Sequence, residues 1–222
     1  MVRRQQWTVL MCMNETTKLP NSAKCPAFAL LARCYDAPTF TYPHTHEQRQ
    51  KSKGNDSKPV RKEVMLVIRG SASTMDWSIN LEEPVVYYPY HYFTSHHTIT
   101  TVYDYVHFGM YKAVMSMLDH YNLRAYLTSL LKEGYEIKVV GHSLGAAVST
   151  LLAAELRNSI VQQRHGLSPV ATTSSKKAIV KDLEGFSQVH QISAVVFAAP
   201  AFLGKYHWSC FNSIQIFFSL IT

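Results

Sequence analysis

The feature that most constrains the fold of this chain is the stretch from Ile137 to Ala147. It joins a short apolar run to a G-x-S-x-G motif at residues 141–145, and small residues then open an amphipathic helix. A serine on a tight turn between a strand and a helix projects its hydroxyl away from the sheet, and the flanking glycines remove side chains that would collide there. The stretch therefore predicts a nucleophile elbow with Ser143 as the nucleophile.

The motif is short enough to occur by chance, so the surrounding elements have to support it. Three apolar, β-branched segments predict strands that are buried on both faces of a sheet: Val64–Ile68, Ile137–Val140 and Ile192–Ala198. Between the first two, leucine and methionine recur at helical spacing, with a break near Asn122 and an end at Gly134. This order of strands and helices predicts an α/β fold with a mostly parallel sheet covered by helices.

Two more helices are predicted from the apolar pattern. Residues 25–35 read as a short buried helix that packs on the sheet. In the helix after the elbow, Glu155 and Arg157 are expected to face water. The residues expected to point into the core from that helix are Val148, Leu151, Leu152 and Leu156.

Length and composition favour a single domain. The chain has 222 residues, of which 47% are hydrophobic, and this suits one α/β domain over residues 1–222 better than two small ones. The polar segments 44–62 and 162–185 are expected to be flexible surface loops. No apolar run reaches the length of about 18 residues that a transmembrane helix needs.

The chain carries a formal charge of +7, much of it in Met1–Gln6 and Arg49–Lys62. A basic loop beside a membrane and a merely solvated loop both fit such runs, and we expect no nucleic-acid partner. Four cysteines without C-x-x-C spacing slightly favour a reducing compartment. The apolar run Trp7–Met13 is at the lower limit for a signal peptide, so a cytoplasmic or peripheral membrane location is favoured over secretion.

Histidines and aromatic residues crowd the segment 82–105, including His91, His96 and His97. No cysteine or acidic residue stands at ligand spacing among them, so ordinary packed or exposed histidines are favoured over a metal site. We expect no metal and no cofactor.

Four blocks in this order resemble the class 3, or fungal-type, lipases, including the sn-1-specific diacylglycerol lipases of the α/β-hydrolase fold. Val67–Leu81 resembles the strand that carries the oxyanion hole and the start of the lid, and Val106–Gly109 resembles the opening of the helix before the elbow. Val139–Ala147 resembles the elbow itself, and Val195–Pro200 more weakly resembles the strand after the elbow helix.

The resemblance implies a role for each matching residue. It makes Ser143 the nucleophile and the backbone N–H groups of Ser71 and Leu144 the oxyanion hole, with the Ser71 hydroxyl assisting. Trp77 becomes a lid residue, and Asn80 stands where the family usually has aspartate. Two structural alternatives stay open: Ser71 could cap the strand end, and Trp77 could belong to the core.

Three polar residues near the matching blocks are not assigned a catalytic role. Arg69 and His107 are interpreted as structural, and His142 as a packed residue of the elbow. The catalytic acid and base are unknown, because in this fold the acid and then the histidine follow the serine along the chain. Asp182 precedes the Ile192 strand and His207 precedes any suitable acid, so neither is assigned. We therefore expect the domain to be incomplete at its C-terminus, with an exposed apolar strand at residues 214–221.

The favoured function is that of a serine lipase that hydrolyses acyl esters of glycerolipids, di- or triacylglycerol, through an acyl-enzyme on Ser143. The lipid would be met at a membrane or another lipid interface. Since a serine without an imidazole base is a weak nucleophile, the alternative is a catalytically incompetent, truncated isoform that binds lipid or has no independent activity. A small-molecule binding domain with a coincidental motif is a third interpretation.

Overall fold

The computed structural model describes residues 6–18, 24–36, 60–82, 85–93, 99–165 and 189–200. Most of the two predicted loops lies outside the described residues, as do Asp182, His207 and the apolar segment 214–221. The few residues of these two segments that the structure describes belong to a strand and a helix. Residues 60–62 begin a strand and residues 162–165 end a helix.

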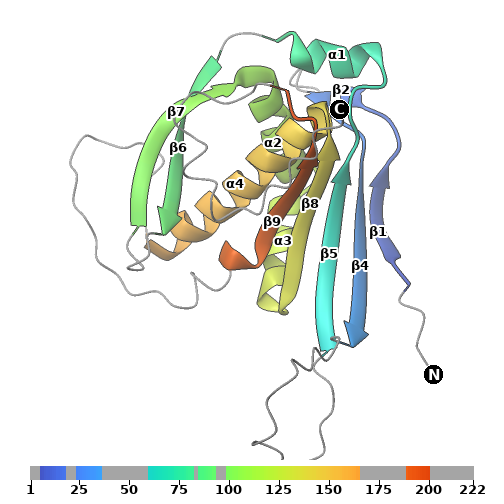
Figure 1. Cartoon of the computed structure of the whole chain (residues 1–222), viewed down its shortest axis with the longest axis vertical. Coiled ribbons are helices and arrows are strands. Elements are labelled where there is room, and N and C mark those ends of the chain that lie inside the picture. The colour runs from blue at the N-terminus through green and yellow to red at the C-terminus, as the bar shows by residue number, and fades with distance from the viewer. Residues whose placement is uncertain are drawn as a thin grey trace, which may run out of the picture.

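A five-stranded sheet in the order β1-β4-β5-β8-β9 forms the centre of the fold (Figure 1). Its strands are β1 Thr8–Met13, β4 Phe28–Asp36, β5 Val60–Ile68, β8 Tyr135–His142 and β9 Ile192–Phe197. The neighbours β5, β8 and β9 are parallel, as the sequence predicted. The neighbours β1, β4 and β5 are antiparallel, so the sheet is mixed rather than mostly parallel. A small pair, β2 Thr17–Lys18 with β3 Lys24–Cys25, lies between β1 and β4 in the chain.

The helices are α1 Thr74–Asn80, α2 Phe108–His120, α3 Leu123–Lys132 and α4 Leu144–His165. Helices α2, α3 and α4 lie beside the sheet, with a hairpin on the far side of α4, whereas α1 lies across the top of the view (Figure 1). The hairpin consists of β6 Val85–Phe93 and β7 Ile99–His107. Helix α4 packs on β8 and β9 with one side and on β6 with the other. The predicted break in the helical segment near Asn122 and its predicted end at Gly134 are confirmed. Both residues leave the helical conformation with a positive φ, 53° at Asn122 and 83° at Gly134.

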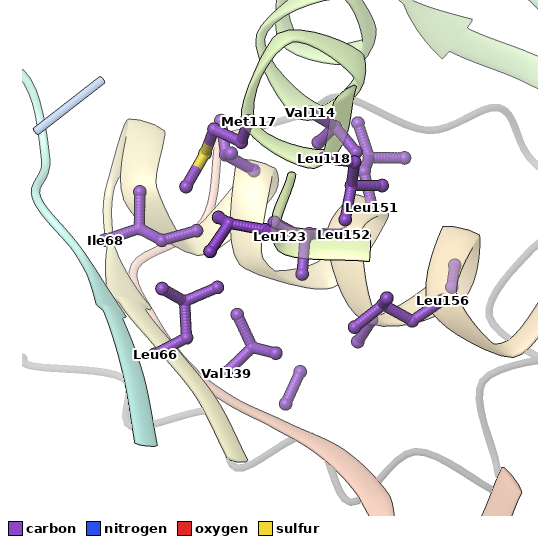
Figure 2. Packing of buried hydrophobic residues seen from close by; sticks show 14 of the residues in the cluster. Leu66, Ile68, Val114, Met117, Leu118, Leu123, Val139, Leu151, Leu152 and Leu156 are labelled. Carbon is purple, nitrogen blue, oxygen red and sulfur yellow. The ribbon is translucent and has the colours of Figure 1, made fainter. Parts of the chain in front are cut away.

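The core lies between the helices and one face of the sheet, where side chains of β5 and β8 meet those of α2, α3 and α4 (Figure 2). Leu66, Ile68 and Val139 point from the strands into this cluster. On the other face, Met65 and Val67 are only half-buried. The strands were expected to be buried on both faces of the sheet. The described helices α2, α3 and α4, however, all cover the same face.

The prediction of a helix over residues 25–35 is wrong, since this segment contributes β3 and β4. Alanine and leucine favour a helix locally, but every residue of β4 pairs with β5, and its first half also pairs with β1. Buried Phe28 and Leu30 flank the less buried Ala29 with the alternation of a strand. Pairing along both edges therefore overrides the local helix propensity. The apolar run considered as a signal peptide supplies β1.

Helix α4 also departs from the prediction at two residues. Its expected core residues are buried, but Arg157 is only 6% exposed and donates from Nη2 to the Ile192 carbonyl oxygen at 2.9 Å. Burial lowers the pKa of this guanidinium to about 10. Glu155 is mostly buried as well and accepts hydrogen bonds from Tyr88 and Arg124. Because the hairpin covers the side of α4 away from the sheet, little of this helix faces water.

A buried carboxylate connects three strands of the sheet. Glu63 on β5 forms ion pairs with Arg33 of β4 and Lys138 of β8, each at 2.5 Å. Burial alone would raise the pKa of Glu63, but the hydrogen bonds and charges of Lys138 and Arg33 outweigh it and lower that pKa. The charged form of Glu63 is therefore the one that the fold favours.

We predict that replacing Glu63 with glutamine makes the free energy of unfolding less dependent on pH. A carboxyl whose pKa is lower in the folded state contributes its full stability above the unfolded pKa of about 4.3, and loses it as pH falls through the folded pKa. Near pH 7 the variant should be less stable by about 2 kcal/mol. Urea denaturation from pH 3 to pH 7 measures both effects. If the free energy of unfolding depended on pH equally in the two proteins, the prediction would be wrong.

Candidate active site

Ser143 lies on a sharp turn between β8 and α4. It has φ 55°, a left-handed conformation that costs a residue with a side chain about 1 kcal/mol. Its N–H donates to the Phe197 carbonyl oxygen at 3.0 Å, and its own carbonyl oxygen accepts from Ala146 at 2.9 Å. Ser143 thus ends the parallel strand pairing with β9 and begins α4 at the same residue. Strain of this kind concentrates at functional sites.

The two glycines of the motif allow this turn to pack closely. A Cβ on Gly141 would lie 2.1 Å from the carbonyl oxygen of Gly145, and a Cβ on Gly145 would lie 2.3 Å from the carbonyl oxygen of Ile68. Both distances are too short for any side chain, and both neighbours are backbone atoms that cannot swing away. The strand, the helix and the end of β5 therefore meet in van der Waals contact at the elbow.

The bend that follows β5 lies directly beside the serine. A Cβ on Gly70 would be 3.5 Å from Cβ of Ser143, and Ser71 is the next residue in the chain. The N–H groups of Leu144 and Gly145 precede the first N–H of α4 that bonds back to Ser143, that of Ala146, and this end of the helix carries partial positive charge. The fold thus brings the bend that contains Ser71 next to Ser143 and Leu144, which lie far from it in the sequence.

Helix α1 follows this bend and carries Trp77. The side chain of Ser73 caps its N-terminus by accepting from the Asp76 N–H at 3.2 Å, and Asp76 accepts in return from the Ser73 N–H at 2.8 Å. Trp77 is 59% exposed, which excludes the alternative that it belongs to the core. Its role as a lid residue stays a prediction.

Sequence reasoning missed the importance of Asp76. This fully buried carboxylate forms an ion pair with Arg69 at 3.0 Å and accepts hydrogen bonds from the Ala72 N–H at 2.9 Å and from the hydroxyl of Thr16. Burial would raise the pKa of Asp76, but the bonds from Thr16, Ala72 and Ser73 lower it overall. Arg69 has the structural role that was predicted for it. The S-x-x-D spacing of a capping box could have identified Asp76.

Asn80, at the end of α1, contacts the predicted oxyanion residue. Its Nδ2 donates to Oγ of Ser71 at 2.9 Å, so the Ser71 side chain faces α1 rather than capping β5. His107, predicted to be structural, caps α2: its Nδ1 accepts from the Met110 N–H at 3.4 Å, and its Nε2 lies 3.0 Å from the Asn80 carbonyl oxygen. The exposed side chain of His142 lies on the elbow rather than packing inside it.

In the part of the chain that the structure describes, no imidazole or carboxylate bonds to the Ser143 hydroxyl, and no group of three or more histidine, cysteine or acidic residues could hold a metal. His91 bonds to Thr101 at 2.8 Å, and burial lowers the pKa of its imidazole. His96 and His97 lie outside the described residues.

A family model for Lipase (class 3) matches residues 65–207, which is more than half of the chain. The chain belongs to the class 3 lipase family. The matched region includes the bend after β5, helix α1 and the elbow. No curated protein matches the chain.

The chain is also similar to solved structures. A fungal lipase–inhibitor complex, presented as a model for interfacial activation, has a TM-score of 0.51 and 17% identity over 96% of this chain and 56% of its own. The triacylglyceride lipase of Rhizomucor miehei has a TM-score of 0.45 and 16% identity over 95% of this chain and 55% of its own. The first likeness shows the α/β-hydrolase fold. This chain spans about half the length of both lipases.

We predict that Gly145→Ala destabilises the protein far more than Gly134→Ala does. The methyl group at position 145 would meet the Ile68 carbonyl oxygen, whereas at position 134 it enters open space and meets only an unfavourable positive φ. The expected losses in the free energy of unfolding are more than about 3 kcal/mol and about 1 kcal/mol. Urea denaturation followed by circular dichroism measures them, and equal losses would show that the elbow is not tightly packed.

Proposed function

We propose that this lipase hydrolyses acyl esters of glycerolipids, di- or triacylglycerol, through an acyl-enzyme on Ser143. The observation that carries the proposal is the conformation of Ser143, which stands at φ 55° on a turn directly ahead of α4 and beside the bend after β5. Membership of the class 3 lipase family supports it, since an elbow serine in this fold is the expected nucleophile.

In the proposed reaction, Oγ of Ser143 attacks the ester carbonyl carbon while a general base takes its proton. The carbonyl oxygen becomes an oxyanion that accepts hydrogen bonds from the N–H groups of Ser71 and Leu144, close to the positive end of α4. The glycerol oxygen then leaves with the proton. Water attacks the acyl-enzyme, which releases the fatty acid and returns the proton to Ser143.

The substrate is proposed to reach Ser143 from a lipid interface. Two large apolar side chains at the edge of α1 are exposed, Trp77 to 59% and Leu81 to 76%. Exposed apolar residues next to a candidate site favour contact with a lipid surface. In the described part of the chain no helix is long and apolar enough to cross a membrane. A peripheral contact through α1 fits both observations.

We predict that a fluorophosphonate probe labels the protein and that Ser143→Ala abolishes the labelling. The probe reacts only with an activated serine, so it tests the nucleophile without knowledge of the natural substrate. Ser129→Ala, at an exposed serine on α3, is the control and should label like the unchanged protein. A folded protein that the probe does not label would rule out the hydrolase and favour the alternative of an incompetent lipid-binding chain.

We also predict that hydrolysis of a short-chain glyceride increases when its concentration passes the point at which it forms an interface. Trp77→Ala should reduce this increase several-fold, because it removes apolar surface that would enter the lipid. Tyr126→Ala is a matched control, since Tyr126 is an exposed aromatic residue on α3. Equal rates on monomeric and aggregated ester would argue against the lipid-facing role of α1.

A further inference from the structure

We propose that the outer face of the β6–β7 hairpin docks on an uncharged lipid surface and holds the lipase there together with α1. This tyrosine face consists of Val85 and Tyr87 of β6 and of Tyr103 and Tyr105 of β7. Such docking deepens the proposed function and rests on it, because an enzyme that takes its substrate from an interface has to stay at that interface.

The hairpin has one packed face and one open face. Tyr88 is buried, and its hydroxyl donates to Glu155 and accepts from Nδ2 of Asn158, both on α4. Successive side chains of a strand point to opposite faces, so Tyr87 points away from α4. Tyr87 is 59% exposed, and Tyr105, with which it pairs across the hairpin, is 54% exposed.

The open face carries no charged group over its first three cross-strand pairs. These pairs are Val85 with His107, Tyr87 with Tyr105, and Pro89 with Tyr103. The acidic residue of β7, Asp104, is buried on the packed face. A charged partner would therefore find no counterpart here. Tyrosine joins an apolar ring to a polar hydroxyl, and it is enriched where membranes meet water.

The rings of the tyrosine face already restrict one another. Tyr87 and Tyr103 are stacked, with ring centres 5.2 Å apart and an angle of 9° between their planes. The rings of Tyr87 and Tyr105 lie 5.4 Å apart. Side chains that are ordered beforehand lose less conformational freedom when a partner covers them. The stacking thus lowers the entropic cost of docking.

The tyrosine face continues the exposed side of α1. Val85 pairs with His107, and Nε2 of His107 lies 3.0 Å from the Asn80 carbonyl oxygen at the end of α1. The next residue, Leu81, is 76% exposed. Figure 1 shows α1 and this end of the hairpin together at the top of the view. The contact through His107 fixes the two elements relative to each other, so one lipid surface can touch both.

Large apolar and aromatic side chains that are more than half exposed concentrate on this combined surface. Those that lie on it are Trp77, Leu81, Val85, Tyr87 and Tyr105. Among the other described residues, only Val9 and Val60 are exposed to that extent, and they lie on β1 and at the start of β5. Exposed apolar patches mark membrane or protein contacts. Membership of a lipase family favours lipid as the partner.

The test is flotation of the full chain with phosphatidylcholine vesicles, which carry no net charge. The variants are Tyr87→Thr, Tyr105→Thr and the double variant, since threonine keeps the strand propensity while it removes the ring. Val60→Thr is the matched control, because it removes another exposed apolar side chain from a strand, at the end of β5 away from the elbow. Thermal unfolding shows which variants are folded.

We expect each tyrosine variant to weaken partitioning into the vesicles about 3-fold, and the double variant to weaken it about 10-fold. Val60→Thr should bind like the unchanged chain. Raising the salt concentration should leave binding unchanged, because the tyrosine face has no charge for salt to screen.

Two results would overturn the inference. Binding that requires anionic vesicles, disappears at high salt and ignores the tyrosine variants would place the contact in the basic segments of the chain. A dimer in sedimentation that Tyr87→Thr abolishes, without vesicle binding, would identify a second copy as the partner.

Fluorophosphonate labelling in lipid-free buffer tests the hydrolase separately from this docking. A chain that is labelled but does not float with the vesicles would overturn the inference and leave the hydrolase intact. A folded chain that floats through its tyrosines but is not labelled would support the docking face and overturn the hydrolase.

Discussion

The contact between the elbow and the end of β5 is the constraint on which the candidate site depends. Gly145 lies so close to the Ile68 carbonyl oxygen that only a hydrogen atom fits between them. This approach places the start of α4, with its partial positive charge, next to the bend at Gly70. Ser143, on the turn between β8 and α4, has a positive φ at this point. A larger residue at position 145 would push the helix away from the strand, and the serine, the helix end and the bend would no longer face one space.

Helix α1 is fixed to this arrangement at both ends rather than resting on it loosely. At its start, the buried Asp76 binds Arg69 and the N–H groups of the bend, and its lowered pKa means that it is charged. At its end, Asn80 contacts Ser71 and His107. A buried carboxylate is tolerated only when its desolvation is compensated in this way. The exposed Trp77 lies between these two anchors, so the fold presents it to solvent while the rest of α1 is held.

The local sequence pattern predicted the strands and turns that carry the candidate site. It failed where the structure of a segment depends on partners that are distant in the sequence. The strands β5, β8 and β9, the break at Asn122 and the elbow follow from apolar runs and from turn residues, which act over a few neighbours. Residues 25–35 have helix-forming side chains, yet they form β4 because strands on both sides take up their backbone groups. Arg157 and Glu155 have the character of surface residues on α4, but Arg157 bonds to β9 and Glu155 to Tyr88 of the hairpin, which has no clear periodicity in the sequence.

The sequence by itself determined the family and the three parallel strands and marked Ser143 as the candidate nucleophile, because these depend on short motifs whose residues are adjacent in the chain. The tertiary structure decided what surrounds the serine. Ser71 and Ser143 are far apart in sequence and come together through the parallel pairing of β5 with β8. The roles of Asp76 and Asn80 depend on groups that only folding brings near them, Thr16 and His107. A side chain's type sets which bonds it can make, but the partner and the direction of each bond follow from the packing of whole elements.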